Sequence, residues 1–116
     1  MAVLTEIVFE GMESSDAVRD RIEGEIDKLE RFHDRITSCR VVLQAPNNHK
    51  THGGLFETRI HMALPGHQEV NVAHTHHKDH AHEDAYVAIR DAFAAARKQL
   101  QSGERKREDA ARRHER

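Results

Sequence analysis

The apolar residues of this chain change their spacing along its length, from that of a strand to that of a helix and back. Residues 3–9 are apolar and β-branched without a breaker, which predicts a strand that ends at Gly11. Ser14 or Ser15 is suited to cap the helix that follows over residues 14–33. The apolar residues of this segment recur every three or four positions, on one helical face: Val18, Ile22, Ile26, Leu29 and Phe32.

Three further strands are predicted, at residues 36–45, 55–64 and 68–74. The first two alternate apolar and polar side chains, so one face of the sheet is expected to be buried and the other wet. Pro65-Gly66 separates the last two strands and indicates a tight hairpin. Cys39 is expected on the apolar face of its strand, which favours the role of a small core residue over that of a nucleophile.

A second helix is predicted over residues 82–101. The face that we expect to be buried carries Tyr86, Ile89, Ala92 or Phe93, Ala96 and Leu100. The far side of the same helix carries Arg90, Ala94, Arg97 and Gln101.

The predicted element order is β-α-β-β-β-α. Because two amphipathic helices are available to cover one face of the sheet, the fold class is α+β, a two-layer sandwich with a four-stranded sheet. With 116 residues, we expect one domain over residues 1–101. Residues 102–116 have almost no apolar side chains to bury, so we expect a basic flexible tail there, either frayed helix or disorder.

Several classes of protein are excluded by what the sequence lacks. No apolar run approaches the roughly 18 residues of a membrane span, and the N-terminus does not resemble a secretory signal. A single cysteine cannot form an internal disulfide, so a cytoplasmic location is expected. No glycine-rich phosphate loop follows a strand, and paired carboxylates occur only on helix surfaces. We therefore expect neither an enzyme nor a cofactor.

Charge is distributed unevenly along the chain. Residues 1–34 hold ten acidic and four basic residues, a net of −6, whereas residues 97–116 hold eight basic and four acidic residues, a net of +4. A basic tail commonly serves as an arm toward polyanions. The alternative is a tail that only increases solubility, because acidic residues are interspersed with the basic ones.

Histidine is unusually frequent, at 11 residues. Imidazole binds zinc, nickel or copper, and it titrates near neutral pH. The histidine-rich stretch around residues 74–82 has neither a zinc signature nor a thiolate, so no metal site is predicted. A metal-binding or pH-sensing module, with RNA affinity that increases below about pH 6.5, remains an alternative hypothesis. Its candidate residues are His74, His76, His77, His80 and His82.

Three stretches of the chain, within residues 3 to about 101, together resemble a known family. They resemble the ribosome hibernation-promoting factors, also called ribosome-associated translation inhibitors, ribosomal subunit interface proteins or sigma-54 modulation proteins. The stretches are Met12-Glu13 with Ala17-Val18-Arg19 and Asp27-Lys28-Leu29-Glu30-Arg31-Phe32, then Leu64-Pro65-Gly66, then His82-Glu83-Asp84-x-Tyr86-x-Ala88-Ile89 with Lys98-Gln99-Leu100.

This resemblance implies a fold and a function. The fold is a four-stranded sheet with two helices on one face, akin to double-stranded RNA-binding domains. The function is binding of the small ribosomal subunit and its 16S rRNA, in the channel used by mRNA and tRNA. Occupation of the channel inhibits translation and promotes hibernation under stress or in stationary phase, without catalysis. Long members add a C-terminal dimerising domain, for which this chain has no room, so a monomer is expected, with no DNA or membrane partner.

Two positions depart from the family pattern. Arg90 stands where an acid usually follows Ala88-Ile89, and Ala95 stands at a position that is usually basic. The first helix is also acidic overall. These departures leave open a third hypothesis, a protein-interaction domain that has lost ribosome binding.

The candidate RNA-binding residues are basic, because RNA is held mainly through Lys and Arg at its phosphates. Two helices side by side on a sheet would present such residues as a basic seam, with Arg31 near Arg21 and Lys28, and Arg19 on the other flank of the apolar stripe. The alternative is that each pairs with a neighbouring acid, which contributes only about 0–1 kcal/mol. The candidates are Arg19, Arg21, Lys28, Arg31, Arg90, Arg97, Lys98, Arg105, Lys106 and Arg107.

Overall fold

The computed structural model describes residues 3–45, 56–74 and 84–114, with side chains in 3–45, 56–73 and 84–103. Its elements follow the predicted order, with ends that differ from the predicted ones by a few residues at most, except at the end of the last helix. They are β1 (Leu4–Glu10), α1 (Asp16–Phe32), β2 (Ser38–Gln44), β3 (Glu57–Leu64), β4 (Gln68–His74) and α2 (Ala85–His114).

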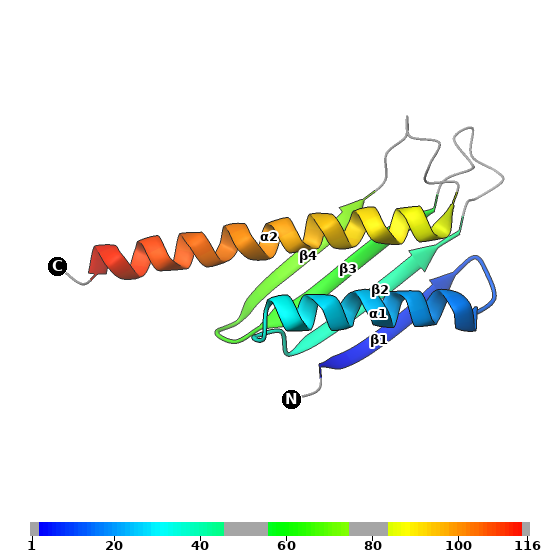
Figure 1. Cartoon of the computed structure of the whole chain (residues 1–116), viewed down its shortest axis with the longest axis horizontal. Helices are drawn as coiled ribbons and strands as arrows, with labels where there is room; N and C mark the ends of the chain where they lie inside the picture. The colour runs from blue at the N-terminus through cyan, green and yellow to red at the C-terminus, as the bar shows by residue number, and fades with distance from the viewer. Residues whose placement is uncertain (1–2, 46–55, 75–83, 115–116) are drawn as a thin grey trace.

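The four strands form one sheet in the order β1-β2-β3-β4. β1 runs parallel to β2, and the other neighbours are antiparallel. Both helices lie on one face of the sheet, with α1 joining the two parallel strands (Figure 1). The predicted two-layer α+β sandwich is therefore confirmed.

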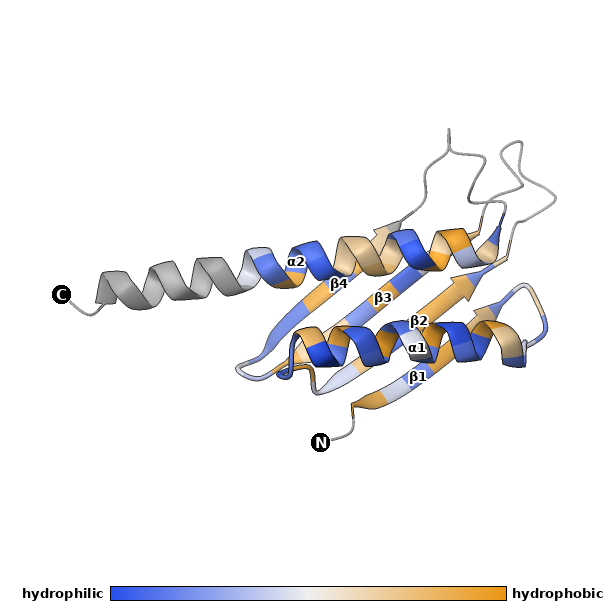
Figure 2. Cartoon of the chain, viewed as in Figure 1, coloured by the Kyte–Doolittle hydropathy of each residue, from blue (hydrophilic) through white to orange (hydrophobic). Residues whose placement is uncertain are grey.

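The core lies between the sheet and the two helices. Alternation in β2 and β3 buries every second side chain on the helix-covered face, as the sequence predicts. Leu43 and Met62 of these strands are fully buried, and Ile22 of α1 packs above them in the same cluster. Figure 2 shows the corresponding orange positions on the strands and on the inner sides of the helices.

Helix α1 begins directly after Ser15, the last residue with an extended backbone. The Ser15 hydroxyl accepts a hydrogen bond from the Val18 N–H at 3.3 Å, so Ser15 and not Ser14 is the cap. The helix ends at His33, which adopts an extended conformation while its N–H still bonds the Leu29 carbonyl at 2.7 Å. These caps set the two ends of α1, and burial of its apolar side sets its rotation above the sheet.

The β3–β4 hairpin is also as predicted. Leu64 pairs with Gln68, which leaves a three-residue turn that includes Gly66 and His67. Both of these residues have positive φ, 81° and 61°. Gly66 adopts this conformation without steric cost, which explains the glycine at this position.

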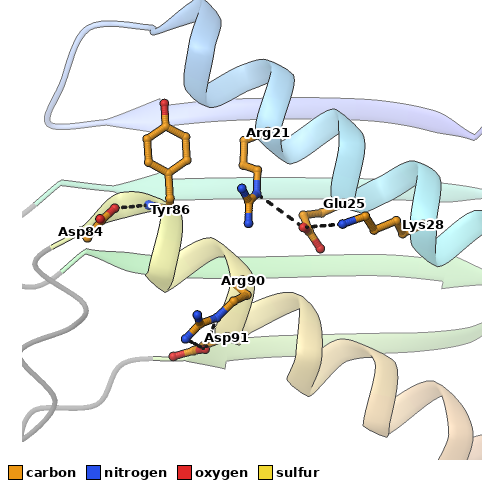
Figure 3. A network of polar contacts seen from close by, with 7 residues as sticks. All are labelled: Arg21, Glu25, Lys28, Asp84, Tyr86, Arg90 and Asp91. Carbon is orange, nitrogen blue, oxygen red and sulfur yellow. Dashed lines mark hydrogen bonds and ion pairs between the residues drawn. The ribbon is translucent and has the colours of Figure 1, made fainter.

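The buried face of α2 corrects one prediction. Tyr86 is 40% exposed and is not part of the buried face, which includes fully buried Ala88 instead. Tyr86 lies in the first turn of α2, on the side that faces α1 and not the sheet (Figure 3). The rest of the predicted stripe is buried, with Ala92 and Phe93 both contributing.

Helix α2 is longer than predicted. It starts at Ala85, not at residue 82, and its backbone stays helical through His114, well beyond the predicted end at residue 101. At about 1.5 Å per residue, its 30 residues span about 45 Å, and the molecule is 57 Å long. The last part of α2 therefore projects beyond the sheet (Figure 1). Within the described residues, neither helix is apolar enough over sufficient length to cross a membrane.

The single cysteine allows a test of the core. Cys39 is buried, and desolvation raises the pKa of its thiol from 9.0 to about 12. We expect the native protein not to react with an aromatic disulfide reagent at pH 8, whereas the urea-unfolded chain reacts stoichiometrically. Because only the unfolded chain ionises between about pH 9 and 12, the free energy of unfolding should fall over that range. Rapid labelling of the native thiol would contradict the burial of Cys39.

Candidate nucleic-acid interface

A groove runs between α1 and α2 on the outer side of the helical layer. Two of its basic side chains come from α1 and three from α2. The lining also includes uncharged side chains, among them Leu29, Phe93 and Ala94, and one carboxylate. The basic residues of this interhelical groove are Arg21, Lys28, Arg90, Arg97 and Lys98.

The spacing of the basic residues explains why they meet. Arg21 and Lys28 are seven residues apart, about two helical turns, and so are Arg90 and Arg97. Each pair therefore projects from one side of its helix. The side of α2 that carries Arg90 and Arg97 faces α1 across the groove, and this juxtaposition creates the predicted seam.

Two aromatic rings lie against the groove arginines. The Arg97 guanidinium carbon is 4.3 Å from the centre of the Phe32 ring, and that of Arg21 is 6.0 Å from the Tyr86 ring. Such cation–π contacts contribute about 0.5–1 kcal/mol at exposed sites, and they restrict the arginine side chains. The sequence reasoning placed both rings on buried stripes and so missed these contacts.

One carboxylate, Glu25, lies inside the groove. It is 13% exposed, and its Oε1 is 3.5 Å from both the Arg21 Nε and the Lys28 Nζ (Figure 3). The sequence reasoning also missed this residue. The available signal was its position, four residues after Arg21 and three before Lys28.

Arg90 is paired with the adjacent acid on its own helix. Its Nη2 is 3.1 Å from the Asp91 Oδ1, and both side chains lie at the surface near the start of α2 (Figure 3). Arg90 therefore pairs with a neighbouring acid, as the alternative expects, and so do Arg21 and Lys28 through Glu25. Because surface pairs of this kind are weak, they leave the basic side chains able to exchange partners.

Arg19 and Arg31 lie outside the groove. The Arg19 guanidinium is 5.6 Å from the ring centre of Phe9, on the β1 side of α1. Arg31 lines a separate hollow with Leu4 and Ile36, so it is not in the seam with Arg21 and Lys28.

The three basic residues of the tail, at positions 105–107, lie on the projecting backbone of α2, and their side chains are outside the described part. Among the candidate metal ligands, the side chain of His74 and all of His76, His77, His80 and His82 also lie outside it. Within the described residues, no three metal-binding side chains come together.

The described histidines lie away from the groove. His33 is buried, and its Nδ1 has no hydrogen-bond partner. His61 lies on the open face of the sheet, where its ring bonds the Asn71 side chain and its Nε2 is 3.9 Å from a carboxylate oxygen of Glu69. Neither of these, nor His67 in the β3–β4 turn, lines the groove.

Comparison with known families identifies the chain. The model of the family described as "Sigma 54 modulation protein / S30EA ribosomal protein" matches residues 5–108, nearly the whole chain. The chain belongs to this family. The match confirms the resemblance to the family of ribosome-associated factors, and no curated protein sequence matches this family member significantly.

Solved structures with the same fold support this placement. The N-terminal domain of Protein Y from Thermus thermophilus is 25% identical, with a TM-score of 0.65 over 88% of this chain and 98% of that one. A ribosomal subunit interface protein from Coxiella burnetii is 16% identical, with a TM-score of 0.71 and the same coverage. The second comparison supports the fold alone.

The two departures from the family pattern affect the groove differently. Ala95 packs against the core and does not line the groove, so the missing basic residue at this position leaves the groove unchanged. Arg90 adds a basic side chain to the groove.

Proposed function

We propose that this family member is a ribosome-binding translation inhibitor. It docks on 16S rRNA of the small subunit in the mRNA and tRNA channel and promotes hibernation under stress or in stationary phase. It acts in the cytoplasm as a monomer and without catalysis. The observation that carries the proposal is the convergence of five basic side chains from two helices on one groove.

The groove suits a sugar–phosphate backbone better than individual bases. Lys and Arg bind phosphates without reading sequence, and the guanidinium group of Arg97 lies against the ring of Phe32, which is therefore not free for base stacking. Recognition by shape and charge is the usual mode for structured RNA. The basic residues of the projecting part of α2 would extend the same contact beyond the domain.

Co-sedimentation with isolated 30S subunits and 70S ribosomes tests this function. Binding should be saturable, and it should weaken steeply as the salt concentration rises from about 0.05 M to about 0.5 M, because phosphate contacts release counterions. Absence of binding even at the lowest salt would favour the alternative of a protein-interaction domain.

Removing the groove's own carboxylate is expected to strengthen RNA binding. Glu25 competes with phosphate for Arg21 and Lys28, so Glu25→Gln frees both cations while it keeps the shape of the side chain. The expected gain in 30S affinity is roughly two- to fivefold, since the lost pairs are partly exposed. Equilibrium binding of labelled protein measures it.

Glu23→Gln is the matched control for this variant. Glu23 lies on the same helix but is exposed and does not line the groove. It changes the net charge equally and should raise affinity less. Equal effects of the two variants would show that net charge, and not displacement of Glu25, controls binding.

The histidine-rich alternative depends on residues outside the described part. Calorimetry with Zn²⁺ or Ni²⁺ tests it. A specific metal site would bind one equivalent with submicromolar affinity, whereas nonspecific binding by clustered histidines would be weaker. Ribosome affinity that is constant between pH 6 and 8 would exclude the pH-sensing form of this hypothesis.

A further inference from the structure

Among the described residues, nothing pairs with the backbone hydrogen-bonding groups on the outer edge of β1. β1 ends the sheet, and no described strand lies beyond it (Figure 1). The Leu4 N–H donates to the Thr37 carbonyl at 3.2 Å, and the Glu10 carbonyl accepts from the Ala45 N–H at 2.9 Å. Both ends of β1 thus bond toward β2.

Because the direction of these groups alternates along a strand, every second residue of β1 turns its N–H and C=O away from β2. These residues are Thr5, Ile7 and Phe9. Together they present three donors and three acceptors at the edge, which is the pattern that an added strand requires.

The same edge is apolar and has no residue that blocks pairing. Ile7 and Phe9 are only partly buried although they pack against the core, and Leu4 is 76% exposed. β1 contains neither proline nor lysine, the residues that commonly protect an edge strand. Its acids, Glu6 and Glu10, already pair with Arg40 and Arg59 on the open face.

An acidic side of α1 overhangs this edge. Asp20, Glu23, Asp27 and Glu30 recur at intervals of three or four residues, so they share one side of the helix. Arg19, which borders these acids on α1, lies over the Phe9 ring of β1, so this flank of the helix is on the β1 side. Asp27 and Glu30 also line a hollow with Leu4 at the start of β1. The nearby bases are Arg19, Arg31 and Arg35, and Asp34 adds a fifth acid in the hollow, so acids outnumber bases by five to three.

We propose that this acidic edge, formed by the outer side of β1 and the four acids of α1, binds an extended basic segment of a protein partner as a fifth strand. Such a strand would lie about 4.8 Å beyond β1, and every second side chain would point toward α1. Lys or Arg at those positions covers Ile7 and Phe9 with its aliphatic stem and reaches Asp20, Glu23 and Asp27 with its charge.

Charge decides among the possible occupants. A second copy, paired β1 to β1 around a two-fold axis, would bring two acidic sides of α1 together, and like charges across an interface oppose binding. Nucleic acid is repelled for the same reason. The interhelical groove lies on the opposite side of α1, so peptide and RNA bind at separate places, and the failure of one proposal leaves the other standing.

The test uses the full chain and a labelled peptide of alternating arginine and threonine, nine residues long. We expect saturable binding by fluorescence anisotropy, and protection of the Thr5, Ile7 and Phe9 amides from hydrogen exchange. A peptide with the same sequence but N-methylated on alternate amides keeps the charge and loses the edge hydrogen bonds. It should bind at least about tenfold more weakly.

A pair of double variants isolates the acidic side. Asp20→Asn with Asp27→Asn should weaken peptide binding about tenfold and leave 30S binding intact or slightly stronger. Glu57→Gln with Glu69→Gln, the same charge change on the open face of the sheet, should have little effect. Equal binding of the two peptides, equal loss in the two double variants, or protection of the three amides by protein concentration alone would overturn the proposal.

Discussion

Saturable binding to the 30S subunit should be lost when three groove charges are reversed together, in Lys28→Glu, Arg97→Glu and Lys98→Glu. Each phosphate contact contributes about 0.7–0.9 to the slope of log affinity against log salt, so three lost contacts should flatten it by about 2 to 3. Affinity near 0.15 M salt should fall roughly a hundredfold or more, because the new carboxylates also repel phosphate.

The matched control for this variant reverses Arg31, Arg35 and Arg40, which lie outside the groove. The change in net charge is the same, so a general electrostatic effect would weaken both variants alike. Co-sedimentation over a salt series measures both slopes, and circular dichroism confirms that both proteins are folded. An unchanged slope in the groove variant would remove the basis of the proposed rRNA contact.

The second large effect is on stability, at the centre of the sheet. Leu43 is fully buried in β2, between β1 and β3, and Leu43→Ala removes three carbon atoms from a packed core. The free energy of unfolding is expected to fall by about 2–5 kcal/mol, since both the transfer term and the cavity contribute. Urea unfolding followed by circular dichroism measures the change.

Leu4→Ala provides the comparison for Leu43→Ala. The chemical change is identical, but Leu4 is largely exposed at the sheet edge, so the expected change is within about 0.5 kcal/mol. Similar losses of unfolding free energy in the two variants would contradict the burial of Leu43 between the sheet and the helices.

The sequence predicts the fold well where one pattern dominates. Alternation in β2 and β3 identifies the buried face of the sheet, and Pro65-Gly66 identifies the hairpin. The end of α2 was missed because the apolar pattern of the sequence ends at Leu100, whereas the helical backbone continues to His114. Tyr86 was misplaced because periodicity does not show whether the side of a helix faces a sheet or another helix.

The site was predictable to the extent that it depends on helical spacing. The seven-residue intervals from Arg21 to Lys28 and from Arg90 to Arg97 indicate shared faces, but only the packing of α1 beside α2 turns the two faces toward each other. This packing brings Glu25 into the groove and the Arg97 guanidinium against the Phe32 ring. The spacing within one helix therefore predicts the basic residues but not the carboxylate and the aromatic ring that contact them.

Because α2 is a single continuous helix, its projecting part has a fixed rotation relative to the part that packs on the sheet. Residues on an α-helix turn by about 100° and advance by about 1.5 Å each, so the rotation of the helical backbone over residues 102–114 is set by the turns packed on the sheet. Inserting one residue at Gly103 would swing the outer segment through about 100° with the groove untouched, whereas seven would return it nearly to its azimuth and lengthen the projecting part by about 10 Å.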